Sequence, residues 1–401
     1  MSTWQKWAPA ALLASVVAAT MFVAGFGVGR YVFPSQDFLV EGVAAKHEEQ
    51  FRVFWEAWRI IEDEFYSEES LDYQAMTYGA VRGMVDSLGD PHTAFLTPAQ
   101  ADMFSQDLEG SFGGIGVTIG STEDGYLQVV GLIPGGPAED SALTPGDAIL
   151  EVDGTSVHGL DTTQAISLIR GPEGTTVRLL VRHATDGAQE EIALTRAMIQ
   201  IPTVESRILS SGIAYLRLWE FNDRATSLVR NGLESSLQSE PRGLILDLRS
   251  NPGGYLHVVE QIADEFIAEG LVLIERSSDG QETRHTASGR GIATDIPLVV
   301  LVDGGSASAS EILAGAIQDH ERGALIGERT YGKGSVQVTE RLSDNSGLAV
   351  TIRRWYTPAD RAIDGTGLAP DIEVLLTQDD LEAGRDPQLE RAESYLLETA
   401  P

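Results

Sequence analysis

The chain has 401 residues, a length that favours two or three globular units over one small core. Asp and Glu number 60 against 28 Lys and Arg, which gives a formal net charge of −32. A surface this acidic repels nucleic acid and anionic lipid, so neither is an expected partner. The absence of cysteine excludes disulfides, thiolate metal sites and cysteine nucleophiles. The seven histidines are scattered without metal-ligand spacing, so no metal and no other cofactor is expected.

The N-terminus carries a long apolar stretch. Residues Ala8–Gly29 contain no charged side chain and are numerous enough to cross a bilayer as a helix. A cleaved signal peptide and a retained anchor both fit this pattern. The stretch is longer than the apolar part of a usual signal peptide and lacks a clean A-x-A site, which favours the anchor. We therefore expect a transmembrane helix that anchors the chain in a membrane, with the remaining body outside the cytoplasm, in the periplasm or at the cell exterior.

The region that follows is predicted to be helical. Large apolar residues recur at three- and four-residue spacing, which predicts an amphipathic helix whose stripe joins a core. They are Phe51, Phe54, Trp55, Trp58 and Ile61. A second helical pattern over Tyr73–Leu88 ends before the turn signal Gly89-Asp90-Pro91.

Residues 111–197 change to short strand patterns around one helix. A glycine-rich segment leads into strands predicted at Tyr126–Leu132 and Ala148–Val152, with a short helix at Pro137–Leu143 and a longer one ending at Arg170. This order resembles a PDZ domain. Gly114-Ile115-Gly116-Val117 matches the carboxylate-binding loop of that family, and Gly146–Gly154 matches its central hairpin.

The physical reading of the glycine-rich loop agrees with this resemblance. Glycines let consecutive backbone N–H groups converge on a carboxylate, and the adjacent strand edge can take up an extended peptide. A simple turn is the alternative for such a loop on its own. The loop, hairpin and helix in sequence favour a peptide-binding role.

The next segment has a mixed α/β pattern. Gly243–Leu248 and Pro297–Val302 are continuous apolar runs, as expected for buried strands, and helices are predicted at Gly254–Glu269 and Ser308–His320. The fold class predicted for the whole chain is therefore a multidomain α+β and α/β protein that begins with a transmembrane helix. The predicted parts are an anchor or signal segment at 1–30, a linker and helical region at 31–110, a PDZ domain at 111–197, a mixed α/β core at 198–376 and an acidic C-terminal tail at 377–401.

Ser308 lies where a buried strand gives way to a helix, the place where open α/β sheets carry their sites. Small neighbouring residues leave room for a substrate backbone. The first turn of the helix offers free N–H groups, including that of Ala309, to a developing oxyanion. Ser308 and Glu311 also form a capping-box pattern, so a purely structural N-cap is the alternative role for Ser308.

Lys333 stands between two glycines in Tyr331–Gln337. A serine nucleophile needs a base, and burial in a low-dielectric site can make a lysine neutral enough for that task. A solvated surface lysine is the ordinary alternative. A phosphate-binding loop is excluded because Gly334 stands where that motif requires Ser or Thr.

Together these motifs resemble the carboxyl-terminal processing proteases, or tail-specific proteases, of serine peptidase family S41. The resemblance is carried by Gly305–Glu311, Gly332–Gln337, Asp247–Gly254, Tyr356–Pro358, Ile363–Gly365 and Pro370-Asp371. With the PDZ-like segment and the N-terminal helices, it covers nearly all of the chain after the apolar stretch. Departures are mild: Asp303 stands where many relatives have Asn, Tyr331 where Phe is common, and Trp355 where Tyr is frequent.

The resemblance implies a serine endopeptidase that cleaves extracytoplasmic proteins near their C-termini, with the PDZ domain recognising the substrate C-terminus. It implies Ser308 as nucleophile, Lys333 as general base and Gln337 as the residue that orients the lysine. The oxyanion hole would combine the Ala309 N–H with one from Gly253 or Gly254. Arg170 matches a position that in some relatives links an occupied PDZ domain to the active site; a helix-end arginine near the helix dipole is the alternative.

Two other interpretations fit the sequence less well. A triad of Ser308, His320 and an aspartate is disfavoured because His320 lies about three helical turns away along the predicted helix. A catalytically inactive PDZ scaffold on a protease fold is disfavoured because Ser308, Lys333 and Gln337 are all present. The expected partners are proteins or peptides with free C-termini. The natural substrate, its preferred terminal residues and the oligomeric state stay open, and a homo-oligomer is compatible with the sequence.

Overall fold

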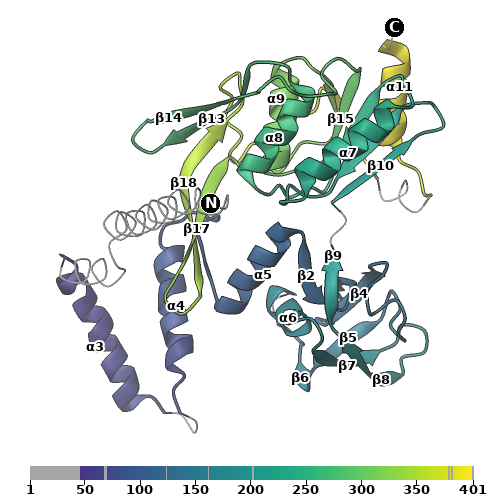
Figure 1. Cartoon of the computed structure of the whole chain (residues 1–401). Coiled ribbons are helices and arrows are strands. Elements are labelled where there is room, and N and C mark those ends of the chain that lie inside the picture. The colour runs from purple at the N-terminus through teal and green to yellow at the C-terminus, as the bar shows by residue number, and fades with distance from the viewer. Residues whose placement is uncertain are drawn as a thin grey trace, which may run out of the picture. The chain divides into compact units, whose positions relative to one another are not determined.

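The computed structural model describes residues 46–66, 70–122, 124–160, 162–200, 203–377, 380 and 383–399. The chain divides into two compact units, Met1–Thr77 and Tyr78–Pro401. The second unit holds a mixed α/β core, an antiparallel sheet and a small β module, each of which follows from a different pattern in the sequence (Figure 1).

The membrane-spanning part of the predicted fold class is corrected. Among the residues that the structure describes, no helix is both long and apolar enough to span a membrane. The apolar stretch Ala8–Gly29, on which that prediction depended, lies outside the described residues.

Helix α3 (Glu48–Glu64) forms where the periodic aromatic pattern predicts it, but its stripe does not join a core. None of its residues is buried, and Trp55 remains 60% exposed. Its aromatic rings contact one another instead, as Phe54 does with Trp55 at 4.9 Å between ring centroids. The periodicity thus predicted the helix correctly and its burial wrongly, because periodicity does not reveal whether a partner surface exists.

The α/β core is built on one six-stranded sheet. Its order is β10 (Val204–Ile208), β11 (Ala214–Leu218), β12 (Leu244–Asp247), β15 (Leu298–Val302), β16 (Ala324–Gly327) and β19 (Ile372–Glu373). The β10–β11 pair is antiparallel, and the other neighbours are parallel. All five residues of β15 and all four of β12 are buried, as their continuous apolar runs predict for strands covered on both faces.

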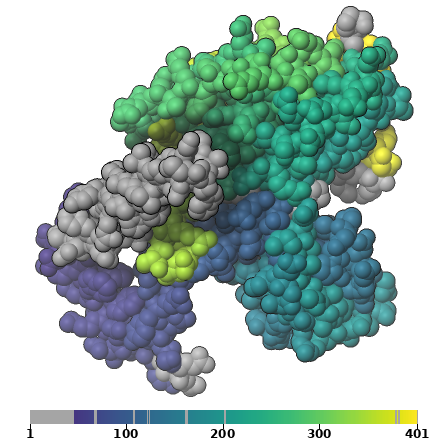
Figure 2. All heavy atoms as spheres, viewed as in Figure 1, coloured from purple at the N-terminus to yellow at the C-terminus, as the bar shows by residue number. Residues whose placement is uncertain are grey.

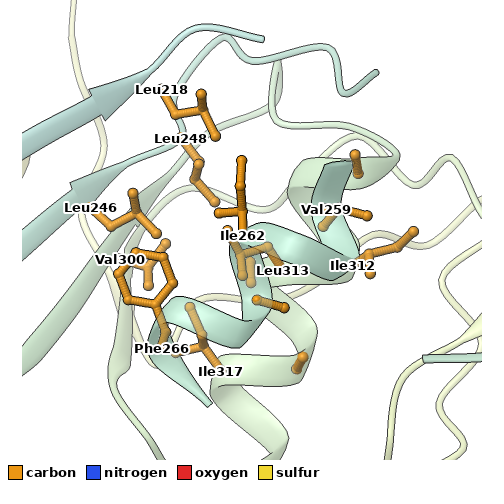
Figure 3. Packing of buried hydrophobic residues seen from close by; sticks show 14 of the residues in the cluster. Leu218, Leu246, Leu248, Val259, Ile262, Phe266, Val300, Ile312, Leu313 and Ile317 are labelled. Carbon is orange, nitrogen blue, oxygen red and sulfur yellow. The ribbon is translucent and has the colours of Figure 1, made fainter. Parts of the chain in front are cut away.

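Helices cover both faces of this sheet. Side chains alternate along β12, so that Leu246 packs with α7 (Ala225–Leu237), α8 (Leu256–Phe266) and α9 (Ala309–Asp319) while Ile245 faces α11 (Pro387–Thr399). Figure 3 shows Leu246 and Val300 meeting Phe266 of α8. Burying a side chain of this size stabilises the fold by about 1.5–3 kcal/mol. This core holds the ends of β12 and β15 in fixed positions.

The helix α11 lies within the region predicted as an acidic tail. Ala392 and Leu396 are buried against Ile245 and Val299 of the sheet. The helix is therefore part of the core, because its apolar stripe covers a sheet face that would otherwise be exposed.

A second sheet carries a long hairpin. Strands β17 (Ser335–Arg341) and β18 (Gly347–Tyr356) pair with each other, and β18 also pairs with β1 (Ala94–Leu96) and β13 (Leu271–Ser277) (Figure 1). Strand β14 (Glu282–Thr286) forms the opposite edge beside β13. Before and after β1 run the helices α4 (Tyr73–Asp86) and α5 (Pro98–Glu109). The hairpin therefore joins Gln337 to an element far earlier in the chain.

The segment predicted as a PDZ domain is a compact β module (Figure 2). Its buried residues form an apolar cluster of their own. Its sheet runs β3 (Val117–Ser121), β4 (Leu127–Leu132), β5 (Ala148–Val152), β7 (Thr176–Arg182) and β8 (Gln189–Thr195), with β6 (Thr155–Ser156) beside β5. Strands β2 (Ser111–Gly114) and β9 (Ala197–Gln200) form a separate pair. Helix α6 (Thr162–Ile169) packs beside β3, the edge strand. The prediction of a short helix at Pro137–Leu143 is wrong, because that segment forms consecutive turns.

Candidate active site

Segments from several distant parts of the chain line a cleft with a volume of about 680 Å³. The carboxyl ends of β12 and β15 lie side by side because the two strands are parallel neighbours, so the loops that follow them share one edge of the sheet. The cleft brings together six residues that the sequence predicts for the chemistry. They are Ser308, Ala309, Lys333, Gln337, Gly253 and Gly254.

Ser308 sits in a strained turn between β15 and α9. Its backbone has φ 54° and ψ −114°, a conformation that L-residues rarely adopt and that costs about 1–3 kcal/mol. Such strain is retained where the surrounding structure enforces it, and it projects the side chain out of the strand-to-helix turn. An ordinary N-cap residue has extended backbone angles. Ser308 nevertheless stands at the N-cap of α9 and forms a capping box with Glu311, so the structural role that the sequence offered is present together with the strain.

Glu311 links the Ser308 turn to the Lys333 loop. Its fully buried carboxylate accepts hydrogen bonds from the backbone N–H groups of Ser308 (2.9 Å), Gly332 (2.7 Å) and Lys333 (2.9 Å), and from the Thr330 hydroxyl (2.6 Å). Burial raises the pKa of Glu311, while these four donors favour its ionised form. The sequence indicated Glu311 only as a capping partner, because its bonds to Gly332 and Lys333 join segments some 20 residues apart.

Lys333 is held by its backbone rather than by a counterion. The indole of Trp355, which is 2% exposed, donates a hydrogen bond to the Lys333 carbonyl at 2.9 Å. The flanking Gly332 and Gly334 pack closely against residues 364–367, where an added Cβ would meet backbone atoms at 3.0 Å or less. The loop therefore holds the lysine at the cleft through main-chain contacts that require glycine on either side.

Burial lowers the pKa of Lys333, and the charge of Glu311 opposes part of that shift. No described residue forms an ion pair with the Lys333 amine, and the Glu311 oxygens are occupied by the four donors named above. A desolvated amine with an incompletely compensated charge loses its proton more readily. The site can therefore supply a neutral amine at a pH where surface lysines are charged.

The two candidate oxyanion glycines have different roles in the structure. The N–H of Gly253 donates to the side chain of Asn251 at 2.9 Å, so it is already engaged. The carbonyl of Gly253 and the N–H of Tyr255 both bond Phe221. Because a trans peptide points its C=O and N–H in opposite directions, the Gly254 N–H faces away from Phe221. Gly254 and Ala309 both line the cleft, which favours this pair as the donors.

Gly253 contributes by having no side chain. An added Cβ would lie 2.8 Å from the Cβ of Ser308 and 3.0 Å from the Ala309 nitrogen, and its φ of 107° also disfavours other residues. The Asn251 amide is fully buried and donates to the carbonyl of Leu218 at 2.8 Å. This asparagine therefore fixes residues 250–254, called the glycine loop below, against the sheet. The sequence indicated only a turn at this position.

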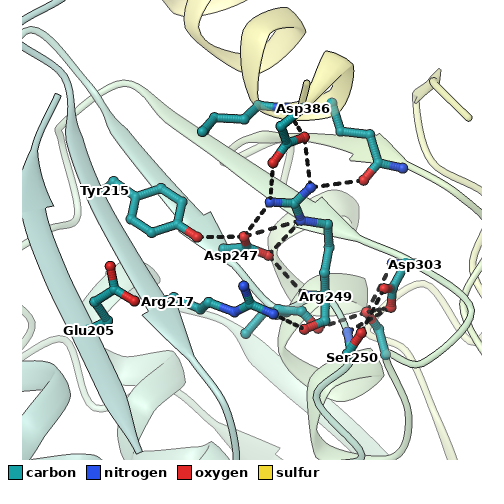
Figure 4. A network of polar contacts seen from close by, with 12 residues as sticks. Glu205, Tyr215, Arg217, Asp247, Arg249, Ser250, Asp303 and Asp386 are labelled. Atoms are coloured by element: carbon teal, nitrogen blue, oxygen red, sulfur yellow. Dashed lines mark hydrogen bonds and ion pairs between the residues drawn. The ribbon is translucent and has the colours of Figure 1, made fainter. Parts of the chain in front are cut away.

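A buried ionic network holds the other end of the same loop (Figure 4). Arg249 donates to Asp247 at 2.7 Å and to Asp386 of the chain's last segment at 2.9 Å, and Tyr215 donates to Asp247 at 2.7 Å. Burial acts against the charge of Arg249, but the hydrogen bonds that it donates to these two carboxylates raise its pKa. Burial, followed by the charge of Asp247 and the hydrogen bond to it, raises the pKa of Tyr215. Both groups keep their protons, so they position the loop.

Asp303 ties the glycine loop to the Ser308 turn. Its carboxylate accepts hydrogen bonds from the Ser250 N–H at 2.7 Å and the Gly305 N–H at 2.9 Å, and its second oxygen accepts the Ser250 hydroxyl at 3.1 Å (Figure 4). Asn at this position offers one oxygen for the two N–H groups and an NH₂ donor for the hydroxyl. This explains how an Asn-to-Asp departure is accommodated.

Gln337 is oriented by the hairpin. Its side-chain NH₂ donates to the Ser335 hydroxyl at 2.7 Å and to the Thr351 hydroxyl at 3.2 Å. Both donor hydrogens are directed toward the hairpin, so the amide oxygen is the atom with acceptor capacity for the cleft.

His320 lies at the far end of α9 from Ser308. Its ring nitrogen contacts the carbonyl of Leu271 at 2.7 Å. The helical rise between the two residues is about 18 Å, which excludes a Ser–His triad at this site.

The remaining predicted residues lie in the β module. Strand β3 begins at Val117, and the carbonyls of Ile115 and Gly116 accept hydrogen bonds from Ala138 (2.8 Å) and Ile133 (2.8 Å), which fixes the loop from behind. Arg170 follows α6 and its guanidinium lies 3.9 Å from the ring centroid of Phe112. The free edge of β3 beside α6 is the geometry that strand addition requires.

These features define a serine-hydrolase type of site on a mixed α/β core, with the serine in a strained strand-to-helix turn, on a chain that also carries a separate β module. Residues 212–374 match the description "Peptidase family S41", and residues 105–182 match "PDZ domain". A carboxyl-terminal-processing protease of Synechocystis is 34% identical, with 80% of each chain covered. The processing protease CtpA of Bacillus subtilis is 31% identical over 91% of this chain and 76% of that protein.

A solved structure agrees with these sequence matches. The photosystem II D1 C-terminal processing protease superposes with a TM-score of 0.54 and 32% identity, covering 80% of this chain and 92% of that one. The chain belongs to the carboxyl-terminal processing proteases of peptidase family S41, and it is a serine peptidase with a PDZ domain.

Proposed function

We propose that this protease hydrolyses peptide bonds near the C-termini of proteins with Ser308 as nucleophile and Lys333 as general base. The observation that carries the proposal is the single cleft that a strained serine and a desolvated lysine both line. Burial lowers the pKa of Lys333, and Glu311 binds the backbone of both residues. A lysine in this state is suited to accept a proton from a hydroxyl.

The chemistry is acyl transfer in two halves. The neutral amine of Lys333 takes the Ser308 hydroxyl proton as Oγ bonds the substrate carbonyl carbon, which moves the carbonyl electron pair onto oxygen. The N–H groups of Ala309 and Gly254 stabilise that oxyanion. Collapse of the tetrahedral intermediate breaks the C–N bond, and the Lys333 ammonium protonates the leaving amine. Water then adds to the acyl-enzyme by the same route and releases the new C-terminus.

We also propose that the PDZ domain binds the substrate's C-terminus. The carboxylate would meet the Gly114-Ile115-Gly116-Val117 loop, and the peptide would extend β3 along its free edge beside α6. Holding the tail in this way raises its local concentration at the cleft. A role for Arg170 in reporting occupancy is part of this proposal, supported by its contact with Phe112 of β2.

The proposed site is tested with the full chain and an unstructured protein carrying a defined C-terminal tail. Ser308→Ala and Lys333→Ala are expected to lower kcat/KM by about 10³-fold or more while a fluorescent tail peptide still binds. Cleavage at the wild-type rate by both variants would overturn the catalytic assignment. The PDZ role is tested with Gly116→Trp, because a bulky side chain at φ 77° blocks the loop. This variant should lose binding of the tail peptide but keep cleavage of casein that lacks the tail.

We propose further that the protease acts outside the cytoplasm. The support is compositional: Ala8–Gly29 is apolar and uncharged, which favours export, and a chain without cysteine needs no reducing compartment. Cell fractionation with an antibody to the β module tests this, because a protein confined to the cytoplasmic fraction would contradict it.

A further inference from the structure

Gln337 lies on β17 and lines the cleft. The other strand of its hairpin, β18, contacts residues far earlier in the sequence. Opposite Gln337 on β18 stands Thr351, and the register shifts by one residue between Val336 and Gln337. Beyond Thr351, the segment between α4 and β1 contributes Asp90 and Thr93. This segment is fixed to the hairpin because β1 pairs with β18, with Ala94 opposite Ala349.

The hydrogen bonds in this group form a continuous chain. The Thr93 hydroxyl donates to Asp90 Oδ2 at 2.6 Å and accepts the Thr351 N–H at 3.1 Å. The Thr351 side chain acts on the Asp90 carboxylate as a hydrogen-bond donor that lowers the pKa of Asp90, and its Oγ1 accepts the Gln337 NH₂ at 3.2 Å. Thr93 is 7% exposed, so the middle of the chain is shielded from water.

The direction of each bond is set by the carboxylate. An ionised carboxylate only accepts hydrogen bonds, so both threonine hydroxyls must donate to Asp90. Each hydroxyl has one hydrogen, so the Thr351 oxygen is left as an acceptor and can receive only the NH₂ side of the Gln337 amide. Burial acts to raise the pKa of Asp90, but the bonds from Thr351 and Thr93 lower it, so the carboxylate stays ionised.

We propose that Asp90, Thr93 and Thr351 are positioning residues that fix the orientation of the Gln337 amide, so that its oxygen rather than its NH₂ faces Lys333. An amide oxygen accepts a hydrogen bond from the amine and holds it toward Ser308. A flipped amide would place two donor hydrogens beside the amine and disfavour its protonated form. The turn at Gly89–Thr93 thus belongs to the catalytic apparatus, although it lies more than 200 residues before Ser308 in the sequence.

This inference rests on the proposed function, and kinetic variants separate the two. Thr351→Val removes the hydroxyl at nearly constant volume, whereas Thr351→Ser keeps it. We expect Thr351→Val to lower kcat about tenfold with little change in KM, because a mispositioned catalytic group costs rate rather than binding. Thr351→Ser should stay within about threefold of wild type. Asp90→Asn should resemble Thr351→Val, since an amide can reverse the donor direction along the chain.

The pH profile and a double variant distinguish positioning from a general loss of structure. A flipped Gln337 amide makes the Lys333 ammonium less stable, so the acid limb of the kcat/KM profile should move to lower pH in Thr351→Val and Asp90→Asn. In a Gln337→Ala background, Thr351→Val should cause no further loss, because its effect acts through that amide. Thr286→Val, an exposed threonine on β14 of the same sheet, is the matched control and should be neutral.

Three outcomes would overturn the inference while leaving the proposed function intact. They are full activity of both Thr351→Val and Asp90→Asn, additive losses in the Gln337→Ala background, or equal losses in Thr351→Val and Thr351→Ser. Unfolding of Thr351→Val, seen by circular dichroism, leaves the decision to Asp90→Asn and its pH profile. Wild-type cleavage by Ser308→Ala or Lys333→Ala would overturn the proposed function itself, whichever result the threonine variants give.

Discussion

Two cations near the same loop, the half-buried Lys333 and the buried Arg249, have opposite surroundings. Lys333 lies in the cleft, where burial lowers its pKa and no described residue pairs with its amine. Arg249 lies at the base of the glycine loop, where Asp247 and Asp386 raise its pKa against the effect of burial. A cation with two carboxylate partners is stable and chemically inert, whereas one deprived of a partner is ready to exchange a proton. This difference in surroundings distinguishes Arg249, which stabilises the site, from Lys333, which can exchange a proton in it.

The residue types fit these two environments. Arginine keeps its charge under all relevant conditions and its planar fork matches a carboxylate, so it suits a permanent structural pair. Lysine can lose its proton when desolvated, so it suits the base. Substitution of Lys333 should therefore lower activity, whereas substitution of Arg249 should lower stability.

The largest effect is expected for Lys333→Arg. Arginine preserves the positive charge and much of the length but cannot act as a neutral base, so kcat/KM should fall by about 10³-fold or more. The measurement is cleavage of the tailed substrate across pH, with thermal unfolding to confirm that the variant is folded. Activity within tenfold of wild type would mean that proton acceptance by residue 333 is not required.

Removing Arg249 should cost stability instead. Arg249→Ala leaves Asp247, which is fully buried, without its cation, and such a loss typically costs about 3–5 kcal/mol. Asp386 is more exposed, so Asp386→Ala should cost about 1 kcal/mol. Urea unfolding in a Ser308→Ala background, which prevents self-cleavage, measures both. A larger loss for Asp386→Ala than for Arg249→Ala would contradict this ranking.

The effect expected for Glu311→Gln is intermediate, because Glu311 binds the backbone of Ser308 and Lys333 and its charge also acts on the Lys333 amine. An amide cannot accept all four hydrogen bonds, so we expect kcat to fall about tenfold through loss of alignment. The Glu311 charge raises the pKa of Lys333, so its removal should move the acid limb of the pH profile to lower pH. Glu340→Gln, an exposed change on β17, is the control. An acid limb displaced to higher pH would argue against this electrostatic coupling.

The smallest effect concerns His183 in the β module, which resembles Arg249 in having two carboxylate neighbours. Hydrogen bonds to Glu190 and Asp147 raise the pKa of His183. A raised folded-state pKa gives stability that is complete below the ordinary histidine value of 6.5 and is lost as pH rises through the folded value. The Ala184 N–H donates to the same Asp147 carboxylate at 2.9 Å, so it reports on this group. Hydrogen exchange of the Ala184 amide should show that His183→Gln weakens the module at pH 5.5 more than at pH 9. Equal effects at both pH values would contradict the assignment.

The sequence predicted the central residues of the site because their chemistry is local. Ser308 follows a buried strand and Lys333 stands between glycines, and both patterns can be recognised within a few residues. The distinction between Gly253 and Gly254 could not be predicted, because it depends on which peptide faces Phe221 across a loop. The roles of Glu311 and Thr351 were also missed, since their partners are distant in sequence.

The same limit applies to the fold. Continuous apolar runs predicted β12 and β15, because burial on both faces leaves a clear pattern. The aromatic stripe of α3 predicted a buried face that the structure does not show, and residues 137–143 form turns rather than a helix. In both cases the local sequence pattern does not show which tertiary partners are available. Those partners decide whether an apolar stripe is covered and whether a short helix is stable.

The most direct test of the central claim is the pH titration of the Lys333 amine in the full-length Ser308→Ala variant, followed by NMR with labelled lysine and assigned by comparison with Lys333→Met. A buried amine deprived of a counterion should titrate clearly below the ordinary lysine value of 10.5. Titration at or above that value would show that the amine stays charged in the cleft, and Lys333 could then not serve as the base.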